Sequence, residues 1–213
     1  MNKLSNILTY NLPDIQILES EKAYDFCVWQ PDDTYIILGR ANDAETAVFT
    51  EKAEKNNLKI LKRPSGGESV ILSPSMIVFS LKITLENLKN PHKIFEIINA
   101  DLISSLTKLG IENLHSKGIS DLSIGEKKIL GSSIYRKQNT LFYHAVLNVK
   151  EDISIISSYL KHPKKEPDYR KGRNHDEFVT SIYREGYEIE FQLLKDTIFS
   201  TLKNLENEFK LFI

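Results

Sequence analysis

The sequence predicts an α+β fold with a mixed, mainly antiparallel central sheet flanked by helices. Strand-like runs dominate the middle of the chain, helix-like runs lie on either side of them, and short hairpin turns outnumber strand–helix alternations. A length of 213 residues suits one sizeable core, and the sequence contains no internal repeat and no clear linker. We therefore expect a single domain over residues 1–213.

The first part of the chain is expected to combine a weak helix with several strands. Residues 12–25 have a weakly helical pattern, and residues 26–29 and 35–39 are typical of a hairpin joined by the turn Pro31-Asp32-Asp33. Asp43 is a suitable cap for a helix to about residue 56. Further strands are expected over residues 58–62, 69–72 and 76–83.

The second part begins with the clearest helix of the sequence, over residues 90–110. Its apolar residues keep helical spacing, and Gly110 ends it. A three-stranded meander is then expected over residues 121–124, 128–136 and 141–149. The remaining expected elements are a helix from Asp152 to about residue 161, a Lys- and Pro-rich loop, a short helix capped by Asn174 and an amphipathic helix over residues 189–206.

Composition narrows the possible partners and the cellular compartment. The formal net charge of −1 supplies no global attraction to nucleic acid or to an anionic membrane. Cys27 is the only cysteine, which excludes an intramolecular disulfide, and its apolar context favours an inert buried thiol. No run of eighteen apolar residues and no apolar leader is present, so we expect a cytoplasmic protein that binds neither membrane nor nucleic acid.

The first candidate site is the turn Arg63-Pro64-Ser65-Gly66-Gly67. Arg63 precedes a proline and is biased to an extended backbone, which is expected to project its guanidinium outward at a strand end. The two glycines let the backbone approach a ligand, so the turn suits a carboxylate or a phosphate. An ordinary hairpin turn with a solvated arginine is the alternative interpretation.

The second candidate site is the segment Lys128-Ile129-Leu130-Gly131-Ser132-Ser133. Strict alternation would place Lys128, Leu130 and Ser132 on one face of a strand and the other three residues on the opposite face. A partly desolvated ammonium can stabilise negative charge on a phosphoryl or acyl oxygen. Asp121 could hold Mg²⁺. A solvated lysine and a structural aspartate remain the alternatives.

Three further features have both a functional and a structural interpretation. His144 lies in a β-prone run and is interpreted first as a hydrogen-bonded sheet histidine and second as a site residue. The loop over residues 161–175 has a local charge near +4 and could close over a nucleotide, receive an acidic surface or simply be solvated. Apolar residues of the first hairpin could line a slot for an alkyl chain or belong to the core; they are Phe26, Val28, Trp29, Tyr35 and Ile37.

Taken together, these segments resemble the lipoate–protein ligase and octanoyltransferase family, over about residues 25–183. The strongest match is Lys128-Ile129-Leu130-Gly131-Ser132-Ser133 followed by Tyr143-His144. The other matching segments are Asp33 to Asn42 with its Gly39-Arg40, Arg63 to Gly67, Ser120-Asp121-Leu122, and the loop from Pro167 to His175. The order and spacing of these motifs are more specific than any one of them.

The resemblance implies a fold like the catalytic core of class II aminoacyl-tRNA synthetases and biotin ligases. It also implies two half-reactions: lipoate or octanoate attacks the α-phosphate of ATP to form acyl-AMP, and a lysine amine then displaces AMP. Lys128 would be catalytic and Asp121 would lie near Mg²⁺. The acyl-adenylate would be held by Arg63, Ser65, Gly66, Gly67, Gly131, Ser132, Ser133 and His144. Implied acceptors are lipoyl domains of 2-oxoacid dehydrogenase complexes or the glycine cleavage H protein.

The departures from the family pattern leave alternatives open. Glu68 stands where the family usually has Gly, Arg or Gln. Leu72-Ser73 stand where many members have His-Asp. Both differences bear on the binding of ATP. The loop 161–175 has no cysteine, so a thioester-forming transferase is not expected. The chain ends without the accessory C-terminal domain of longer ligases, so activation could involve a separate accessory chain.

Four rival functions follow from these departures and from the composition. The first is cysteine-independent acyl transfer from an acyl carrier donor. The second is a non-catalytic acyl- or adenylate-binding module. A biotin ligase is less favoured because its repeated Gly-Arg turn is absent, and a nucleic-acid binder is supported only by the basic loop.

Overall fold

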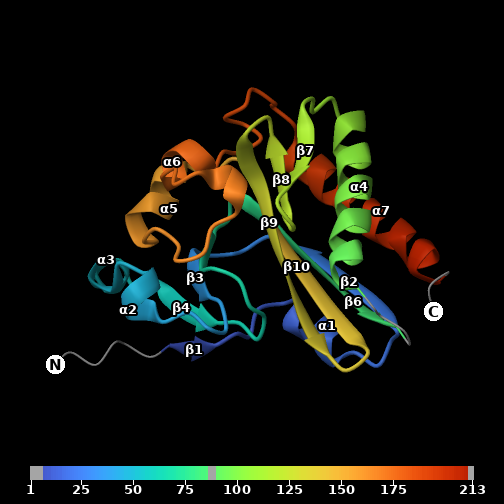
Figure 1. Ribbon diagram of the computed structural model, residues 1–213, viewed down its shortest axis with the longest axis horizontal. Helices are drawn as coiled ribbons and strands as arrows, with labels where there is room; N and C mark the ends of the chain where they lie inside the picture. The colour runs from blue at the N-terminus through green and yellow to red at the C-terminus, as the bar shows by residue number, and fades with distance from the viewer. Residues whose placement is uncertain (1–6, 86–89, 211–213) are drawn as a thin grey trace.

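The protein, described by a computed structural model over residues 7–85 and 90–210, contains two sheets with helices packed around them (Figure 1). The larger sheet is antiparallel and has the strand order β2-β6-β10-β9-β8-β7. Its strands are β2 (Tyr24–Trp29), β6 (Met76–Thr84), β7 (Leu114–Lys117), β8 (Asp121–Ile124), β9 (Lys127–Lys137) and β10 (Thr140–Asn148). This arrangement confirms the predicted α+β class.

The smaller sheet is mixed and has the order β1-β4-β3-β5. Its strands are β1 (Leu8–Thr9), β3 (Tyr35–Leu38), β4 (Lys59–Lys62) and β5 (Val70–Leu72). The strand β4 pairs in parallel with β1 and β3, whereas β5 runs antiparallel to β3. All four residues of β3 are buried, as expected for a central strand covered on both faces.

The helices divide between the two sheets. The two long helices, α4 (His92–Lys108) and α7 (Phe191–Lys210), pack against each other and cover one face of the larger sheet (Figure 1). The short helices are α1 (Ile15–Glu19), α2 (Ala44–Ala47), α3 (Thr50–Lys55), α5 (Ile153–Tyr159), the 3-10 turn η1 (Asp168–Arg170) and α6 (His175–Phe178). Within the described ranges, no helix is both long and apolar enough to cross a bilayer.

The main core forms where α4 and α7 meet the larger sheet. The strand β6 is the centre of this contact, because eight of its nine residues are buried and it pairs with both β2 and β10. From α4, Ile98, Leu102 and Leu106 pack into the same cluster at helical spacing. The apolar periodicity over residues 90–110 therefore predicted this helix and its buried face correctly.

The predicted hairpin of residues 26–29 and 35–39 is wrong. The strand β2 pairs with β6 in the larger sheet, and β3 pairs with β4 and β5 in the smaller one. The segment between them, in which Tyr35 donates a hydrogen bond to Asp32, therefore crosses from one sheet to the other. A short turn resembles a hairpin locally, but long-range pairing decides which strands are neighbours.

The predicted helix from Asp43 to residue 56 is interrupted. Asp43 accepts a hydrogen bond from the Glu45 amide and caps α2, as predicted, but Val48 is extended and bridges to Leu160 before α3 begins. The caps at Asp152 and Asn174 are confirmed. The short strands β1 and β7 were missed because neither carries an alternating apolar pattern.

Candidate active site

A cavity of about 1070 Å³ lies where the two sheets meet. The smaller sheet contributes Ile37 and the segment after Arg63, and the larger sheet contributes β9 and β10. Residues 160–170 close it from the side of α5 and α6. The cavity therefore brings together residues that lie far apart in the sequence, including Arg63, Lys128 and His144.

Arg63 points into its own turn and does not project outward as predicted. Its side chain is buried, Nε donates to Ser65 Oγ at 3.0 Å, and Nη2 donates to the carbonyls of Gly66 and Glu68, both at 2.8 Å. Burial lowers the pKa of the guanidinium to about 10, which leaves it charged at neutral pH. The turn offers three acceptors within reach of one fork, so the side chain folds back to pair with them. Arg63 thus shapes the turn, and its contact with a ligand stays a prediction.

The backbone of this turn packs against the end of β3. Gly67 has φ +88°, and its carbonyl oxygen would lie only 1.9 Å from a Cβ added to Gly39. Because that contact is with main chain, a side chain at position 39 would displace the turn. The Gly39-Arg40 motif therefore serves to bring the Arg63 turn close to the smaller sheet.

Ser65, Ser133 and His144 form a compact hydrogen-bonded group. His144 Nε2 lies 2.6 Å from Ser65 Oγ and 2.7 Å from Ser133 Oγ, and Ser133 Oγ donates to Ser65 Oγ at 3.1 Å. Burial, with a smaller effect of Arg63, lowers the pKa of His144 to about 3. The imidazole is therefore neutral at physiological pH, and its main visible role is to fasten the Arg63 turn to β9 and β10.

A buried carboxylate supports the other side of the histidine. Asp14 Oδ2 lies 4.0 Å from His144 Nδ1 and accepts a hydrogen bond from Ser80, while Oδ1 accepts one from Tyr10, both at 2.7 Å. Burial raises the pKa of Asp14 despite these two donors. Sequence reasoning missed Asp14 and Tyr10, because Ser80 and His144, which show that the pair belongs to the site, lie far away along the chain.

Lys128 is paired with Asp121 at the polar end of the cavity. Its Nζ lies 2.8 Å from Asp121 Oδ1, and Asp121 Oδ2 accepts a hydrogen bond from the Tyr169 hydroxyl at 2.8 Å. Asp121 is buried, whereas the lysine side chain is 28% exposed. The pair therefore holds the ammonium at the cavity wall with part of its surface open.

A β-bulge corrects the predicted alternation along β9. Leu122 pairs with Leu130 but Ser123 pairs with Lys128, so Ile129 is an extra residue. Lys128 consequently lies beside Gly131, where an added Cβ would meet its Nζ and Cε at 2.7 Å, and not on the face of Leu130. Ser132 donates instead to the carbonyl of Ser120 at 2.8 Å, which ties β9 to the start of β8.

The predicted contact of Asp121 with Mg²⁺ stays a prediction. Both carboxylate oxygens already have protein partners, one of which is a cation. Within residues 7–85 and 90–210, no three His, Cys, Asp or Glu side chains gather in an arrangement that could hold a metal ion. The chemistry of this donor set is that of an anchor for Lys128.

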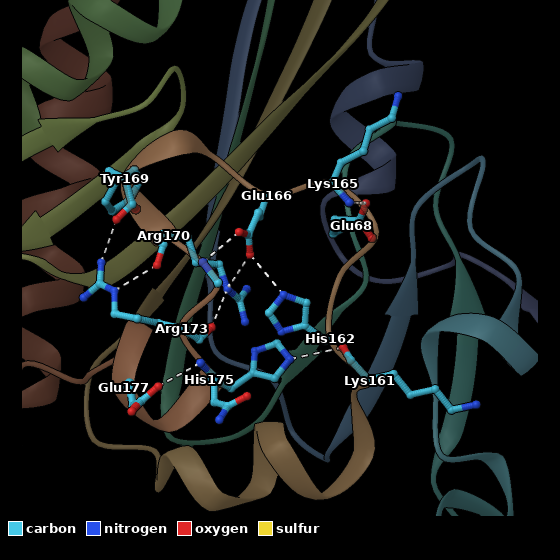
Figure 2. Close-up of polar contacts among 12 residues, drawn as sticks. Glu68, Lys161, His162, Lys165, Glu166, Tyr169, Arg170, Arg173, His175 and Glu177 are labelled. Atoms are coloured by element: carbon cyan, nitrogen blue, oxygen red, sulfur yellow. Dashed lines mark hydrogen bonds and ion pairs between the residues drawn. The ribbon is translucent and has the colours of Figure 1, made fainter.

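The loop over residues 161–175 is fastened to the cavity rim (Figure 2). The Lys165 amide donates to Glu68 Oε1 at 3.2 Å, and Tyr169 reaches Asp121 from the other side. Glu166 accepts from the Gly172 amide at 2.8 Å and lies 3.0 Å from His162 Nε2. Glu68, the residue that departs from the family pattern, thus contacts this loop. Tyr169 was not among the predicted site residues, although it lies in the segment Pro167 to His175 that resembles the family.

Of the two interpretations of the apolar residues in the first expected hairpin, core packing holds for four of the five. Of these five residues, only Ile37 lines the cavity. Phe26 and Val28 pack against the main core, and Trp29 and Tyr35 belong to a separate apolar cluster with Tyr10 and Leu12. The apolar lining is instead Ile71, Leu72, Met76, Val78, Val146, Ile156, Leu160 and Val179. Burial raises the pKa of the half-buried Cys27 thiol to about 11, in agreement with an inert residue.

Comparison with known proteins connects this site to one family. The family model described as the lipoyl protein ligase A/B catalytic domain matches residues 16–203. A lipoate-protein ligase A bound with ATP has 20% identity and a TM-score of 0.77, with 90% of this chain and 77% of that chain covered. A bi-partite lipoate protein ligase of Thermoplasma acidophilum, described with its E2 lipoyl domain, has 18% identity, a TM-score of 0.75 and coverages of 95% and 84%.

A third solved structure has the same fold. It is a protein of T. acidophilum with bound lipoic acid, with 19% identity, a TM-score of 0.76 and coverages of 90% and 77%. At these identities the likeness of the structures establishes the shared fold, whereas the family model covers most of the chain.

Proposed function

The chain belongs to the lipoyl protein ligase A/B catalytic domain family and is an enzyme of the lipoate–protein ligase class, and from this premise we propose its reaction. The enzyme activates lipoate or octanoate with ATP as an acyl-adenylate. It then transfers the acyl group to a lysine amine of a lipoyl domain. We also propose that residues 1–213 act as one catalytic domain, because both sheets contribute to the cavity.

One observation supports the proposal above all others. The Arg63 turn and Lys128, which were singled out from the sequence, line a single cavity that also has an apolar region. A cavity with a cationic wall and an apolar lining suits a ligand with one anionic and one alkyl end. Lipoate, octanoate and their adenylates all have this character.

In the first half-reaction, a carboxylate oxygen of the acid attacks the α-phosphorus of ATP, and pyrophosphate leaves. Lys128, fixed by Asp121, is assigned to the negative charge that develops where acyl and phosphoryl oxygens meet. The Ser65 to Gly67 turn and the segment Gly131 to Ser133 are assigned to the adenylate. Positioning and electrostatic stabilisation account for catalysis of this kind without an enzyme nucleophile.

In the second half-reaction, the neutral lysine amine of the acceptor attacks the acyl carbonyl carbon, and AMP leaves with the bonding electron pair. The amine loses a proton to solvent water as the amide forms. His144 is not assigned to this proton, because its low pKa makes it a weak base and its Nε2 lies against two serine hydroxyls. Its assigned role is to position Ser133 and the Arg63 turn.

The acceptor and any second chain are part of the proposal. The bi-partite archaeal ligase described with its E2 lipoyl domain supports a lipoyl domain as the acceptor class. It is also a precedent for an accessory chain that is separate from the catalytic one. A glycine cleavage H protein is a further acceptor to compare.

The decisive experiment follows the mass of an apo lipoyl domain incubated with the enzyme, ATP, magnesium and lipoic or octanoic acid. Wild type is expected to add one acyl group, and Lys128→Met is expected to lower the rate about 100-fold or more. Lys127→Met is the matched control, because Lys127 is the exposed neighbour paired with Glu185 outside the cavity.

The donor arms separate the alternatives. No acylation with either free acid, with or without a candidate accessory chain, would overturn the ligase. Acylation only from an acyl carrier protein donor and without ATP would select the transferase. Ligand binding without any modified lysine would select the non-catalytic binding module.

A further inference from the structure

Arg170 carries an unused hydrogen-bond donor at the wall of the cavity. The residue is only 4% exposed, and its Nη2 is one of the few buried side-chain polar atoms within residues 7–85 and 90–210 that have no hydrogen-bond partner. Buried arginines are ordinarily paired, because a desolvated donor without an acceptor is unfavourable. Arg170 therefore has capacity for an acceptor that the chain itself does not provide.

The remainder of the guanidinium is fixed in place. Its Nε donates to the carbonyl of Arg173 at 2.9 Å and lies 3.4 Å from Glu166 Oε2, and its carbon lies 4.8 Å from the ring centre of Phe178. Figure 2 shows the side chain enclosed between the loop and the labelled residues Glu166 and His162. These contacts leave little freedom of rotation, so the buried, unpaired Nη2 is held in one orientation.

The charge around Arg170 is not balanced within the loop. Glu166 is the nearby carboxylate, and it already serves His162 and the Gly172 amide. Arg173 contributes a second guanidinium on the same Phe178 ring, at 5.2 Å, and its three hydrogen bonds go to main-chain carbonyls. Two guanidinium groups beside one ring favour an anion.

The neighbouring residue places Arg170 in the same site as Lys128. Tyr169 donates to Asp121, and the other oxygen of Asp121 holds Lys128 Nζ. Both Arg170 and Lys128 line the cavity. One carboxylate thus links the loop that carries Arg170 to the lysine of β9.

We propose that Arg170 binds a phosphate group of the nucleotide through its unpaired Nη2. This inference rests on the proposed function, since it assigns the anion in that cavity to ATP or to the adenylate formed from it. An arginine fork suits phosphate oxygens, and the pre-fixed side chain loses little freedom when it binds. The loop 161–175 then takes part in nucleotide binding through this residue.

Isothermal titration calorimetry with ATP, AMP and pyrophosphate tests the assignment on the full chain. Arg170→Met is expected to weaken the phosphate ligand about 10- to 100-fold, the range of a lost hydrogen bond to a charged group. Arg170→Lys is expected to restore part of the affinity. Weakening of ATP and pyrophosphate but not AMP identifies the β- or γ-phosphate, whereas equal weakening of ATP and AMP identifies the α-phosphate.

Lys171→Gln is the matched control, because it also removes one positive charge. Lys171 is the exposed neighbour of Arg170 and is not among the residues that line the cavity. Thermal unfolding separates the structural role of Arg170 from its role in binding. Arg170→Met removes the hydrogen bond to Arg173 and the contact with Glu166, so the ligand-free variant is expected to melt at a lower temperature than wild type. In addition, the variant is expected to lose most of the increase in melting temperature that ATP gives to wild type. Met retains an unbranched apolar side chain against Phe178.

Two results overturn the inference. One is equal affinity of wild type and Arg170→Met for all three ligands; the other is a weakening by Lys171→Gln as large as that by Arg170→Met. Failure of the proposed function can be distinguished from failure of the Arg170 inference. If wild type does not acylate the acceptor but binds phosphate ligands in a manner that depends on Arg170, the ligase proposal is wrong and the anion site stands. Acylation that Arg170→Met leaves unchanged removes only the anion site.

Discussion

Lys128 Nζ lies 2.8 Å from Asp121 Oδ1, and this short ion pair fixes the ammonium at the wall of the cavity. The carboxylate is buried and receives a second bond from Tyr169, so its position does not depend on the lysine alone. Asp121 is therefore a positioning residue in the proposed mechanism, and the site can be tested one contact at a time.

Asp121→Asn is expected to lower kcat about 10- to 100-fold, because Lys128 loses the charge that orients it. The concentration of magnesium that gives half-maximal rate is expected to change less than about twofold. Initial rates measured over a magnesium titration in both proteins check this. A requirement for much more magnesium in the variant would identify Asp121 as a metal ligand and contradict the assignment.

Gly131→Ala is expected to displace the ammonium of Lys128, because the new Cβ would lie 2.7 Å from Nζ. The lysine end is flexible, so the free energy of unfolding is expected to fall by less than about 1 kcal/mol while kcat falls at least about tenfold. Urea unfolding and acylation rates on the same preparation separate the two effects. Loss of stability in proportion to activity would argue for a general disturbance of β9.

His144 is expected to make stability depend on pH below about 6.5. Its folded pKa of about 3 lies below the unfolded value, so the unfolded chain binds a proton that the folded chain does not. This contribution is present above pH 6.5 and is lost as the pH falls toward 3. His175 acts in the same direction and Asp14, whose folded pKa is raised, in the opposite one.

The measurement is therefore a difference between two proteins. At each pH, the free energy of unfolding of His144→Gln is subtracted from that of wild type. This difference is expected to be about 2 kcal/mol more positive at pH 7 than at pH 5. Urea unfolding at both values gives this difference. If the difference is the same at both pH values, His144 does not have the lowered pKa.

Tyr169→Phe is expected to loosen the loop 161–175, because it removes the hydrogen bond to Asp121. A bond of this kind contributes about 1 kcal/mol, which corresponds to roughly fivefold faster amide exchange in the loop. Hydrogen exchange read by mass spectrometry checks this, with the exposed Tyr183→Phe as the comparison. Unchanged exchange in the loop would show that Glu68 and the remaining contacts suffice to hold it.

Much of the fold was predictable because its signals are local. The periodicity of Ile98, Leu102 and Leu106 is visible in any window of the sequence, and so are the caps at Asp152 and Asn174. The partner of a strand is not local. The wrong hairpin at residues 26–39 arose because the turn chemistry of Pro31-Asp32-Asp33 is compatible with a hairpin and with a crossover.

The site was predictable to the extent that its residues fall in short motifs. Arg63 and Lys128 were placed correctly at one cavity, but the orientation of Arg63 depends on acceptors that only the folded turn brings within reach. Asp14 was missed because Ser80, its partner, is 66 residues away. Arg170 lies in the segment Pro167 to His175, but its proposed phosphate contact depends on an unpaired side-chain atom that no sequence pattern reveals.

The bulge at Ile129 lets β9 absorb one residue without a change in the face of its side chains. Removing Ile129 would restore regular pairing and keep Lys128 opposite Ser123, on the face of Gly131, and exchanging Ile129 for valine would also leave the lysine where it is. Acylation by both variants is therefore expected to persist, and acylation rates check this. A deletion in the regular part of β9 is expected to abolish acylation, because it would move the side chains on one side of the deletion to the opposite face.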